Sequence, residues 1–133
     1  MSESKLVLVS DAMTPTVRTI EAMASIRDAI RLMQEHRVSS LVVERRDDAD
    51  EYGLITVAEI AREVIATNRS TERVNVYEIM VKPVMSLPAD MQVKYGVRQL
   101  VRYGLSRALV IDRARHPVGI VTLRDLVLQA EPV

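Results

Sequence analysis

The stretch that decides the fold is Gly119-Ile120-Val121-Thr122-Leu123-Arg124-Asp125. Its glycine and the two β-branched residues that follow predict a buried strand. Thr122 and Asp125 are three positions apart, which is the spacing of a capping box at the start of a helix. The stretch therefore predicts a strand that runs directly into a helix, with a hydroxyl and a carboxylate at the helix N-terminus. Unpaired N–H groups at such a terminus suit a phosphate, and the carboxylate suits sugar hydroxyls.

The same pattern occurs earlier in the chain, as Gly53-Leu54-Ile55-Thr56-Val57-Ala58-Glu59. The two halves keep a constant register: Met80 follows Met13 by 67 positions, and after a loop that is one residue shorter Gly119 follows Gly53 by 66. A constant offset over most of the chain indicates an internal duplication.

Within the first repeat, hydrophobic periodicity and turn residues predict five elements in the order strand, helix, strand, strand, helix. They are a half-buried strand at Thr16–Ile20, a helix that begins after Ser25 and ends near Arg37, strands at Leu41–Val43 and Gly53–Thr56, and a helix that ends near Thr67. The polar stretch 67–73 reads as a linker. We therefore expect an α/β (α+β) fold with two β-α-β-β-α repeats, at residues 10–67 and 74–130. Residues 1–10 could form an added strand or a helical turn.

Composition bounds the function. A unit of about 60 residues buries only about 60% of its unfolded surface, so two such units should share a core. The chain has no Phe, Trp or Cys, and its 18 basic residues balance 18 acidic ones. We therefore expect an aliphatic core, no disulfide or sulfur-ligated zinc, and neither nucleic acid nor a membrane as partner. No apolar run reaches the length of a membrane span, which favours a cytoplasmic location.

Other polar clusters predict neither a catalytic site nor a metal site. The acidic run Asp47-Asp48-Ala49-Asp50-Glu51 lacks the glycine and the distal glutamate of a calcium loop. His36 and His116 have no partner at metal spacing, and no catalytic triad can be assembled around them. The sequence therefore favours a protein that is not an enzyme.

The duplicated pattern resembles a tandem pair of CBS domains, a family named for cystathionine β-synthase. The resemblance extends from about Ser10 to Gln129. It rests on Met13 and Met80, on the two strand-to-helix turns, and on the passages His36-Arg37-Val38-Ser39-Ser40-Leu41-Val42-Val43 and Leu105-Ser106-Arg107-Ala108-Leu109-Val110-Ile111-Asp112. It implies that the two repeats pack with pseudo-twofold symmetry into one module, with two clefts that bind adenosine-containing ligands.

By position, the resemblance implies a nucleotide-binding residue set for each cleft. One cleft would use Thr122, Asp125 and Arg124 of the second turn with Thr16, Val17, Arg18, Ser39 and Ser40. The other would use Thr56 and Glu59 of the first turn with Pro83, Val84 and Met85. Arg107 stands where family members often place a basic residue against phosphate, and it could serve either cleft.

Simpler roles for the same residues stay open. The two turns can be capping boxes and no more, the serines can be strand starts, and Arg107 can form a surface ion pair. The family usually has Asp where this chain has Glu59. The longer side chain moves the carboxylate by about one carbon, enough to spoil a bidentate ribose contact.

The resemblance implies a non-catalytic regulatory module that senses an adenine nucleotide. The ligand could be AMP, ADP, ATP, S-adenosylmethionine or a dinucleotide such as NAD, and no cofactor with a catalytic role is expected. Apolar helix faces predict a homodimer, and an effector protein that the sequence does not identify could receive the signal. The alternative is an adaptor or dimerisation protein whose ligand clefts have degenerated.

Overall fold

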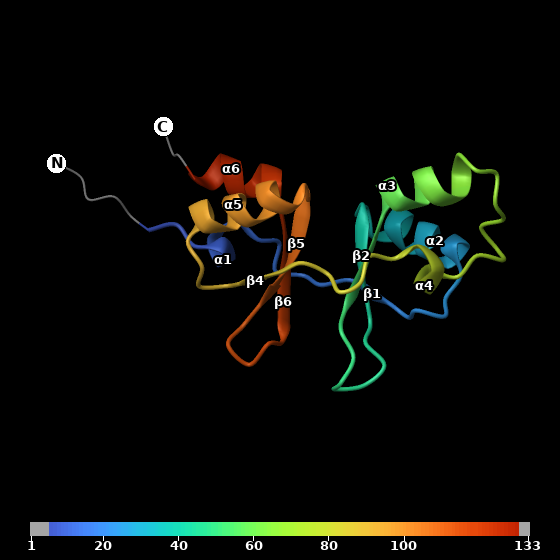
Figure 1. The fold of residues 1–133 in the computed structure, drawn as a ribbon, viewed down its shortest axis with the longest axis horizontal. Coiled ribbons are helices and arrows are strands. Elements are labelled where there is room, and N and C mark those ends of the chain that lie inside the picture. The colour runs from blue at the N-terminus through green and yellow to red at the C-terminus, as the bar shows by residue number, and fades with distance from the viewer. Residues whose placement is uncertain (1–5, 131–133) are drawn as a thin grey trace. The chain divides into compact units, whose positions relative to one another are not determined.

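The structure is a computed structural model, and it describes residues 6–130. The first repeat contains β1 (Thr19–Ile20), α2 (Ile26–His36), β2 (Ser40–Val43), β3 (Gly53–Thr56), α3 (Val57–Ile60) and the π-helical turn η1 (Ala61–Ile65). The second contains β4 (Ser86–Pro88), α5 (Val93–Tyr103), β5 (Arg107–Ile111), β6 (Pro117–Thr122) and α6 (Leu123–Ala130) (Figure 1). The predicted β-α-β-β-α order is thus confirmed in both repeats. A short helix precedes the first strand of each repeat, α1 (Val9–Ala12) before β1 and α4 (Val76–Ile79) before β4.

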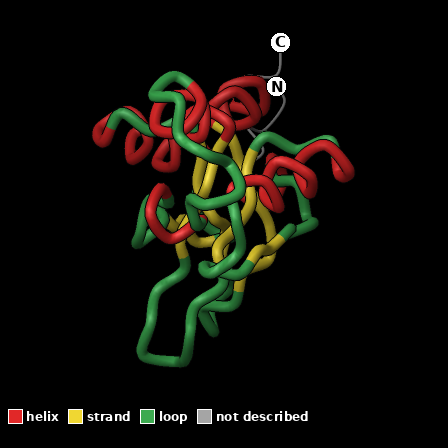
Figure 2. The backbone as a smooth tube through the Cα atoms, turned by 90° about the vertical axis from the view of Figure 1, so that its right-hand side faces the viewer, coloured by secondary structure: helices red, strands yellow, loops and turns green. Residues whose placement is uncertain are grey.

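Each repeat builds a small three-stranded sheet. β1 pairs with β2 in parallel, with Thr19 opposite Val42, and β2 pairs with β3 antiparallel, with Ser40 opposite Thr56. The second sheet has the same order, β4-β5-β6, and places Arg107 opposite Thr122. Loops form much of the remaining chain, as the green tube in Figure 2 shows.

The chain divides into two compact units, and their boundaries differ from those of the sequence repeats. One unit holds residues 18–84, and the other combines residues up to 17 with the chain from 85 onward. The beginning of each repeat therefore belongs to the unit that holds the sheet of the other repeat: α1 lies with the second sheet and α4 with the first. We call residues 9–15 and 76–82 the leading segments.

The cores of both units are aliphatic, as the absence of Phe and Trp predicts. In the unit 18–84, α2 buries one face against the sheet, and α4 closes the same cluster with Val76 and Ile79. In the other unit, Val9 of α1 is fully buried with Leu100 of α5 and Leu126 of α6. Each core thus contains side chains from a leading segment of the other repeat.

Two glycines allow the leading segments to approach the sheets. Thr14 and Ile120 exchange backbone hydrogen bonds of 2.8 and 3.0 Å. A Cβ atom on Gly119 would lie 2.6 Å from both the Met13 Sδ and the Thr14 carbonyl oxygen. Around Gly53 the equivalent contacts are looser, with the Met80 Sδ at 3.0 Å. The methionines and glycines that mark both repeats in the sequence therefore meet each other in space.

The first strand of the first repeat is shorter than predicted. Of the expected stretch Thr16–Ile20, only Thr19 and Ile20 pair within the first sheet. The chain just before it pairs with β6 instead, through Thr14. Of residues 1–10, for which a strand or a helical turn was open, residues 6–8 are extended and α1 begins at Val9. Met1–Lys5 lie outside the described residues.

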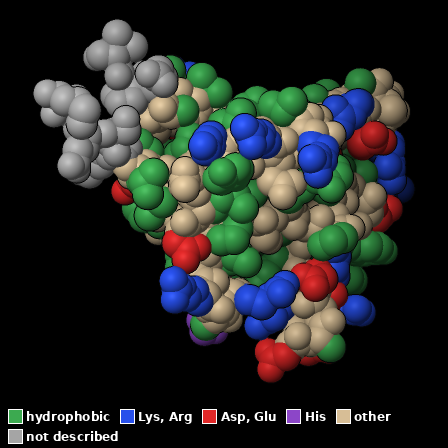
Figure 3. All heavy atoms as spheres, turned by 60° about the vertical axis from the view of Figure 1, so that its left-hand side comes forward, with side chains coloured by type: hydrophobic (Ala, Val, Ile, Leu, Met, Phe, Trp, Pro, Cys, Tyr) green, Lys and Arg blue, Asp and Glu red, His purple; other side chains and the backbone are tan. Residues whose placement is uncertain are grey.

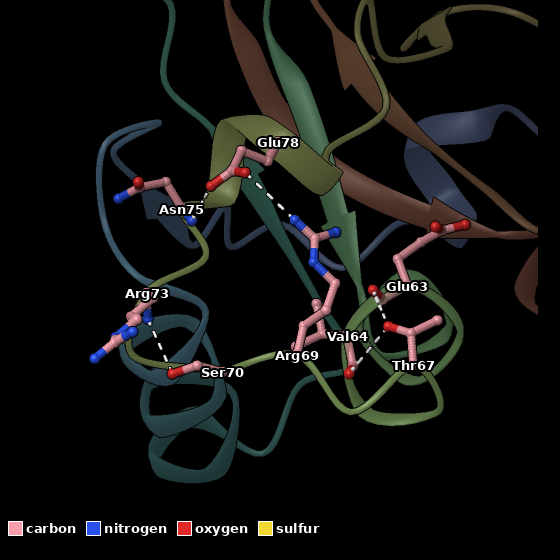
Figure 4. Close-up of polar contacts among 8 residues, drawn as sticks. All are labelled: Glu63, Val64, Thr67, Arg69, Ser70, Arg73, Asn75 and Glu78. Atoms are coloured by element: carbon pink, nitrogen blue, oxygen red, sulfur yellow. Dashed lines mark hydrogen bonds and ion pairs between the residues drawn. The ribbon is translucent and has the colours of Figure 1, made fainter.

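Polar contacts tie the predicted linker 67–73 to η1 at its first residue and to α4 through Arg69 (Figure 4). The Thr67 hydroxyl donates to the Glu63 carbonyl oxygen over 2.7 Å at the end of η1. At the start of α4, the Asn75 backbone N–H donates to a Glu78 carboxylate oxygen over 2.8 Å, and Arg69 of the linker approaches the other oxygen at 3.4 Å. The linker therefore contacts both the helix that it leaves and the helix that it enters.

Candidate functional site

The turn between β3 and α3 forms a complete capping box. The Thr56 hydroxyl oxygen accepts a hydrogen bond from the Glu59 backbone N–H over 3.3 Å. In return, Glu59 Oε1 accepts one from the Thr56 N–H over 3.0 Å, and Oε2 lies 3.7 Å from Arg62 Nη2. The side chain of Glu59 is only 15% exposed. Both carboxylate oxygens are thus engaged within the protein.

The equivalent turn between β6 and α6 forms only half of this arrangement. The Thr122 hydroxyl oxygen accepts a hydrogen bond from the Asp125 N–H over 3.1 Å, as at the first turn. The half-buried Asp125 carboxylate, however, has neither a hydrogen-bond donor nor an ion-pair partner among residues 6–130. The shorter side chain therefore leaves a carboxylate at the N-terminus of α6 that is available to a ligand.

The middle strand of each sheet brings further predicted residues to the turn of its own repeat. Ser40 lies opposite Thr56, and the Ser39 carbonyl oxygen accepts from the Val57 N–H over 3.0 Å. In the second repeat, Arg107 lies opposite Thr122, and Arg124 is exposed in the first turn of α6. Ser39, Ser40 and Arg107 each take part in a polar interaction.

Sequence reasoning missed one residue at the second turn. The Ser106 carbonyl oxygen accepts from the Leu123 N–H over 2.7 Å, which fixes the strand before Arg107 against the turn. The signal that could have found it is the 67-residue register, which equates Ser106 with the predicted Ser39.

The site residues predicted from the first strand of each repeat follow directly after the leading segments. Thr14, two residues before Thr16, forms an isolated antiparallel bridge with Ile120 of β6. The Val84 N–H likewise donates to the Tyr52 carbonyl oxygen over 2.9 Å, at the residue before β3. The remaining positions, Arg18, Pro83 and Met85, are exposed, exposed and half-buried respectively. Their grouping with a turn into a cleft stays a prediction.

The electrostatics of the described surface are mixed. Basic and acidic side chains both occur among apolar ones on the face shown in Figure 3. No group of three or more His, Asp or Glu side chains within residues 6–130 could hold a metal ion. One carboxyl group is strongly perturbed: the Lys82 ammonium, 2.6 Å away, holds the pKa of Asp50 well below its usual range, aided by the Arg46 N–H.

The arrangement of the elements matches a known family over both repeats. A family model of the CBS domain matches residues 9–66 and again residues 76–130. The chain belongs to the CBS domain family. CBS domain pairs are regulatory modules, so the match accounts for the duplication, for the two turns and for the α/β fold.

Curated relatives of this CBS pair are longer proteins. An uncharacterized protein of Methanopyrus kandleri is 32% identical over 100 residues, which are 75% of this chain and 50% of the relative. The L-aspartate semialdehyde sulfurtransferase of Methanocaldococcus jannaschii is 29% identical over 128 residues, 93% of this chain but 23% of that enzyme. The chain thus spans half or less of these relatives, and the similarity to the sulfurtransferase concerns only part of it.

Solved structures with the same fold include ligand complexes. A hexameric CBS-CP12 protein from bloom-forming cyanobacteria has a TM-score of 0.90 at 31% identity, over 95% of this chain and 72% of its own. The CBS domain pair of protein MJ0100, in complex with 5′-methylthioadenosine and S-adenosyl-L-methionine, has a TM-score of 0.78 at 27% identity, over 93% and 95%. The CBS domain of a bacterial CNNM/CorC family Mg²⁺ transporter, in complex with ATP, has 0.75 at 25%, over 92% and 86%. Neighbours of this CBS pair therefore bind adenosine-containing ligands.

Between residues 6 and 130, no helix of this CBS pair combines the length and the apolar character that crossing a bilayer requires.

Proposed function

We propose that this CBS pair is a non-catalytic regulatory module that binds an adenine nucleotide at the turn between β6 and α6. The observation that carries the proposal is the Asp125 carboxylate, which no donor or cation among the described residues engages, while the Asp125 backbone N–H is already capped by Thr122. A carboxylate in this state can accept charge-assisted hydrogen bonds from the two hydroxyls of a ribose.

Basic residues close to this turn suit the phosphate end of the ligand. Arg107 lies opposite Thr122 in the β5–β6 ladder, and Arg124 lies one residue before Asp125. A guanidinium offers paired N–H donors with the geometry of a phosphate. The predicted residues Thr16 and Val17, which belong to the same compact unit as Asp125, would complete this binding site.

The first turn has the opposite character. Because Glu59 already accepts from the Thr56 N–H and pairs with Arg62, a ribose would have to displace both contacts. We therefore propose that the cleft of Thr56, Glu59, Pro83 and Val84 contributes less to ligand affinity.

The test is calorimetric titration of the purified chain with AMP, ADP, ATP, S-adenosylmethionine and NAD. For the ligand that binds, Asp125→Ala should weaken affinity by about 10- to 150-fold, the loss of charged hydrogen bonds. The matched control is Glu59→Ala, which should weaken it much less. Equal affinity of the two variants and the unaltered chain would show that both turns are caps only.

An adaptor whose clefts have degenerated is the second candidate, and one surface favours it. An apolar groove of about 310 Å³ runs between α2 and the α3–η1 helix, with Ile30, Val38, Val57 and Ile65 among its walls. A second copy of the chain is the occupant we propose, because a hexameric neighbour shows that CBS proteins of this fold self-associate. Native mass spectrometry separates the candidates, since a retained nucleotide excludes degenerate clefts.

A further inference from the structure

A second pocket, of about 590 Å³, lies wholly within the unit 18–84. Its walls come from the residues that follow β1 and β2, from α4 and from the chain after it. Ser40 begins β2 beside Thr56, whereas the pocket lies beyond Val43, where β2 ends. The pocket is therefore separate from the Thr56–Glu59 turn, at the opposite end of the strand.

Two glutamates enter the pocket wall from adjacent strands. β1 and β2 are parallel, with Ile20 opposite Val43, and the next residues are Glu21 and Glu44. The Glu44 N–H donates to the Ile20 carbonyl oxygen over 2.9 Å, which continues the pairing by one step. Both side chains thus leave the same edge of the sheet, where parallel strands place their carboxyl ends.

The cations around the pocket have ion-pair partners within the described chain, whereas two of its carboxylates do not. Lys82 Nζ lies 2.6 Å and Arg46 Nε 3.3 Å from the Asp50 carboxylate, so this buried carboxylate holds two of the lining cations. Within the described chain Glu21 and Glu44 have no ion-pair partner, and Glu44 accepts only the Thr19 hydroxyl, over 3.2 Å. Two carboxylates at neighbouring strand ends, with no cationic partner in the described chain, favour a cationic ligand.

The third cation of the wall is compensated as well. Arg45 Nη2 lies 3.4 Å from an Asp48 oxygen, and its guanidinium stacks over the Tyr52 ring.

The remaining wall is apolar. Ala22 and Met80 are half-buried, and Met23 and Tyr77 are 71% and 49% exposed. An aromatic face and polarisable thioethers are favourable surroundings for a cation that carries alkyl groups. The volume lies in the range of small-molecule pockets, and no set of three metal ligands occurs within residues 6–130.

We propose that this pocket binds a small organic cation whose charged group carries apolar substituents, such as an alkylated ammonium. The carboxylates of Glu21 and Glu44 supply the opposite charge, and Tyr77 with the two methionines contacts the alkyl groups. The nucleotide turn and this pocket share no residue, so the two proposals stand independently.

The test uses choline as probe and 3,3-dimethylbutan-1-ol, its uncharged isostere, as the comparison ligand. Titrated into the ¹⁵N-labelled chain, choline should shift amide resonances of residues 21–23, 44–46 and 77–82, with a dissociation constant of about 1 mM, as suits a ligand of so few atoms. The uncharged isostere should bind at least about fivefold more weakly, because it lacks the charge interactions.

Charge-neutral variants locate the effect. The double variant Glu21→Gln with Glu44→Gln should weaken choline binding by about fivefold or more. Glu35→Gln, at an exposed position of α2 outside the pocket, is the control and should leave it unchanged. The proposal is overturned if choline at about 50 mM causes no shifts, if choline and its isostere bind equally well, or if the double variant binds choline as well as the unaltered chain does. Shifts elicited only by lysine-rich peptides would also overturn it, in favour of a protein partner.

Discussion

The side chain of Glu59 is one methylene group longer than that of Asp125, and this difference gives the two equivalent turns different contacts. The longer side chain reaches back to the N–H of the threonine three residues earlier, over 3.0 Å. The shorter one leaves its oxygens without a partner in the described chain, although both threonines cap alike. A capping contact and an available ligand acceptor are therefore alternatives at this position.

Exchanging the two acids should exchange these properties. Asp125→Glu should complete the second capping box and raise the free energy of unfolding by about 0.5–1 kcal/mol, while it weakens nucleotide binding. Glu59→Asp should have the opposite effect on stability. Chemical denaturation of each variant gives the first quantity and calorimetry the second. If Asp125→Glu binds nucleotide as well as the unaltered chain does, the carboxylate is not a ribose contact.

Asp50 should make stability depend on acid pH. Its pKa is depressed in the folded chain by Lys82 and Arg46, so its ionised form favours folding. This contribution is fully present above the unfolded pKa of about 3.9 and is lost as the pH falls through the lower folded value. The stability difference between the unaltered chain and Asp50→Asn should therefore shrink below about pH 4. Unfolding curves at pH 7 and pH 3 measure it, and a constant difference would contradict it.

At the scale of elements, sequence patterns predicted correctly those helix and strand ends that depend on contacts between residues close in sequence. The start of α2 at Ser25 is correct because the Ser25 hydroxyl oxygen accepts from the Asp28 N–H over 3.0 Å, within the same turn. The strand predicted at Thr16–Ile20 is longer than the observed β1. The chain before β1 pairs instead with β6, where Thr14 meets Ile120, more than a hundred residues away. Alternation of polar and apolar residues does not say which partner an extended segment takes. The turns could be predicted from spacing because their residues are close in sequence. The pocket beside β1 and β2 could not, because its walls come from segments that are far apart in sequence.

The packing of each leading segment against its sheet requires a glycine in the sheet, and the requirement is stricter at Gly119 than at Gly53. Gly119→Ala should destabilise the chain by about 1–3 kcal/mol, because the new methyl group would clash with the backbone oxygen of Thr14 at 2.6 Å. Gly53→Ala is the matched control and should cost less, since its closest contact is the flexible Met80 side chain at 3.0 Å. Thermal unfolding of both variants ranks them, and equal costs would contradict the difference in packing.

At the scale of the whole molecule, exposed apolar side chains gather on the terminal helices of both repeats. Val57 and Ile65 are 50% and 57% exposed in the first repeat, and Val127 and Leu128 are 52% and 60% exposed in α6. Surfaces of this kind on a small protein favour association.

Sedimentation at micromolar concentration should therefore show a dimer or a larger assembly. Ile65→Glu should shift it toward the monomer, because the substitution places a charge in the apolar groove between α2 and η1. Glu63→Gln, on the same helical turn but outside the groove, should not. A monomer with and without nucleotide would exclude the dimer.

The crossed leading segments mean that neither repeat is a self-sufficient folding unit. A polypeptide cut in the linker would leave the second half without Val9 and the first half without Val76 and Ile79, each fully or nearly fully buried. The two fragments should be poorly folded alone and regain structure when mixed. The chain thus has the contacts of a domain-swapped homodimer whose two copies are joined covalently.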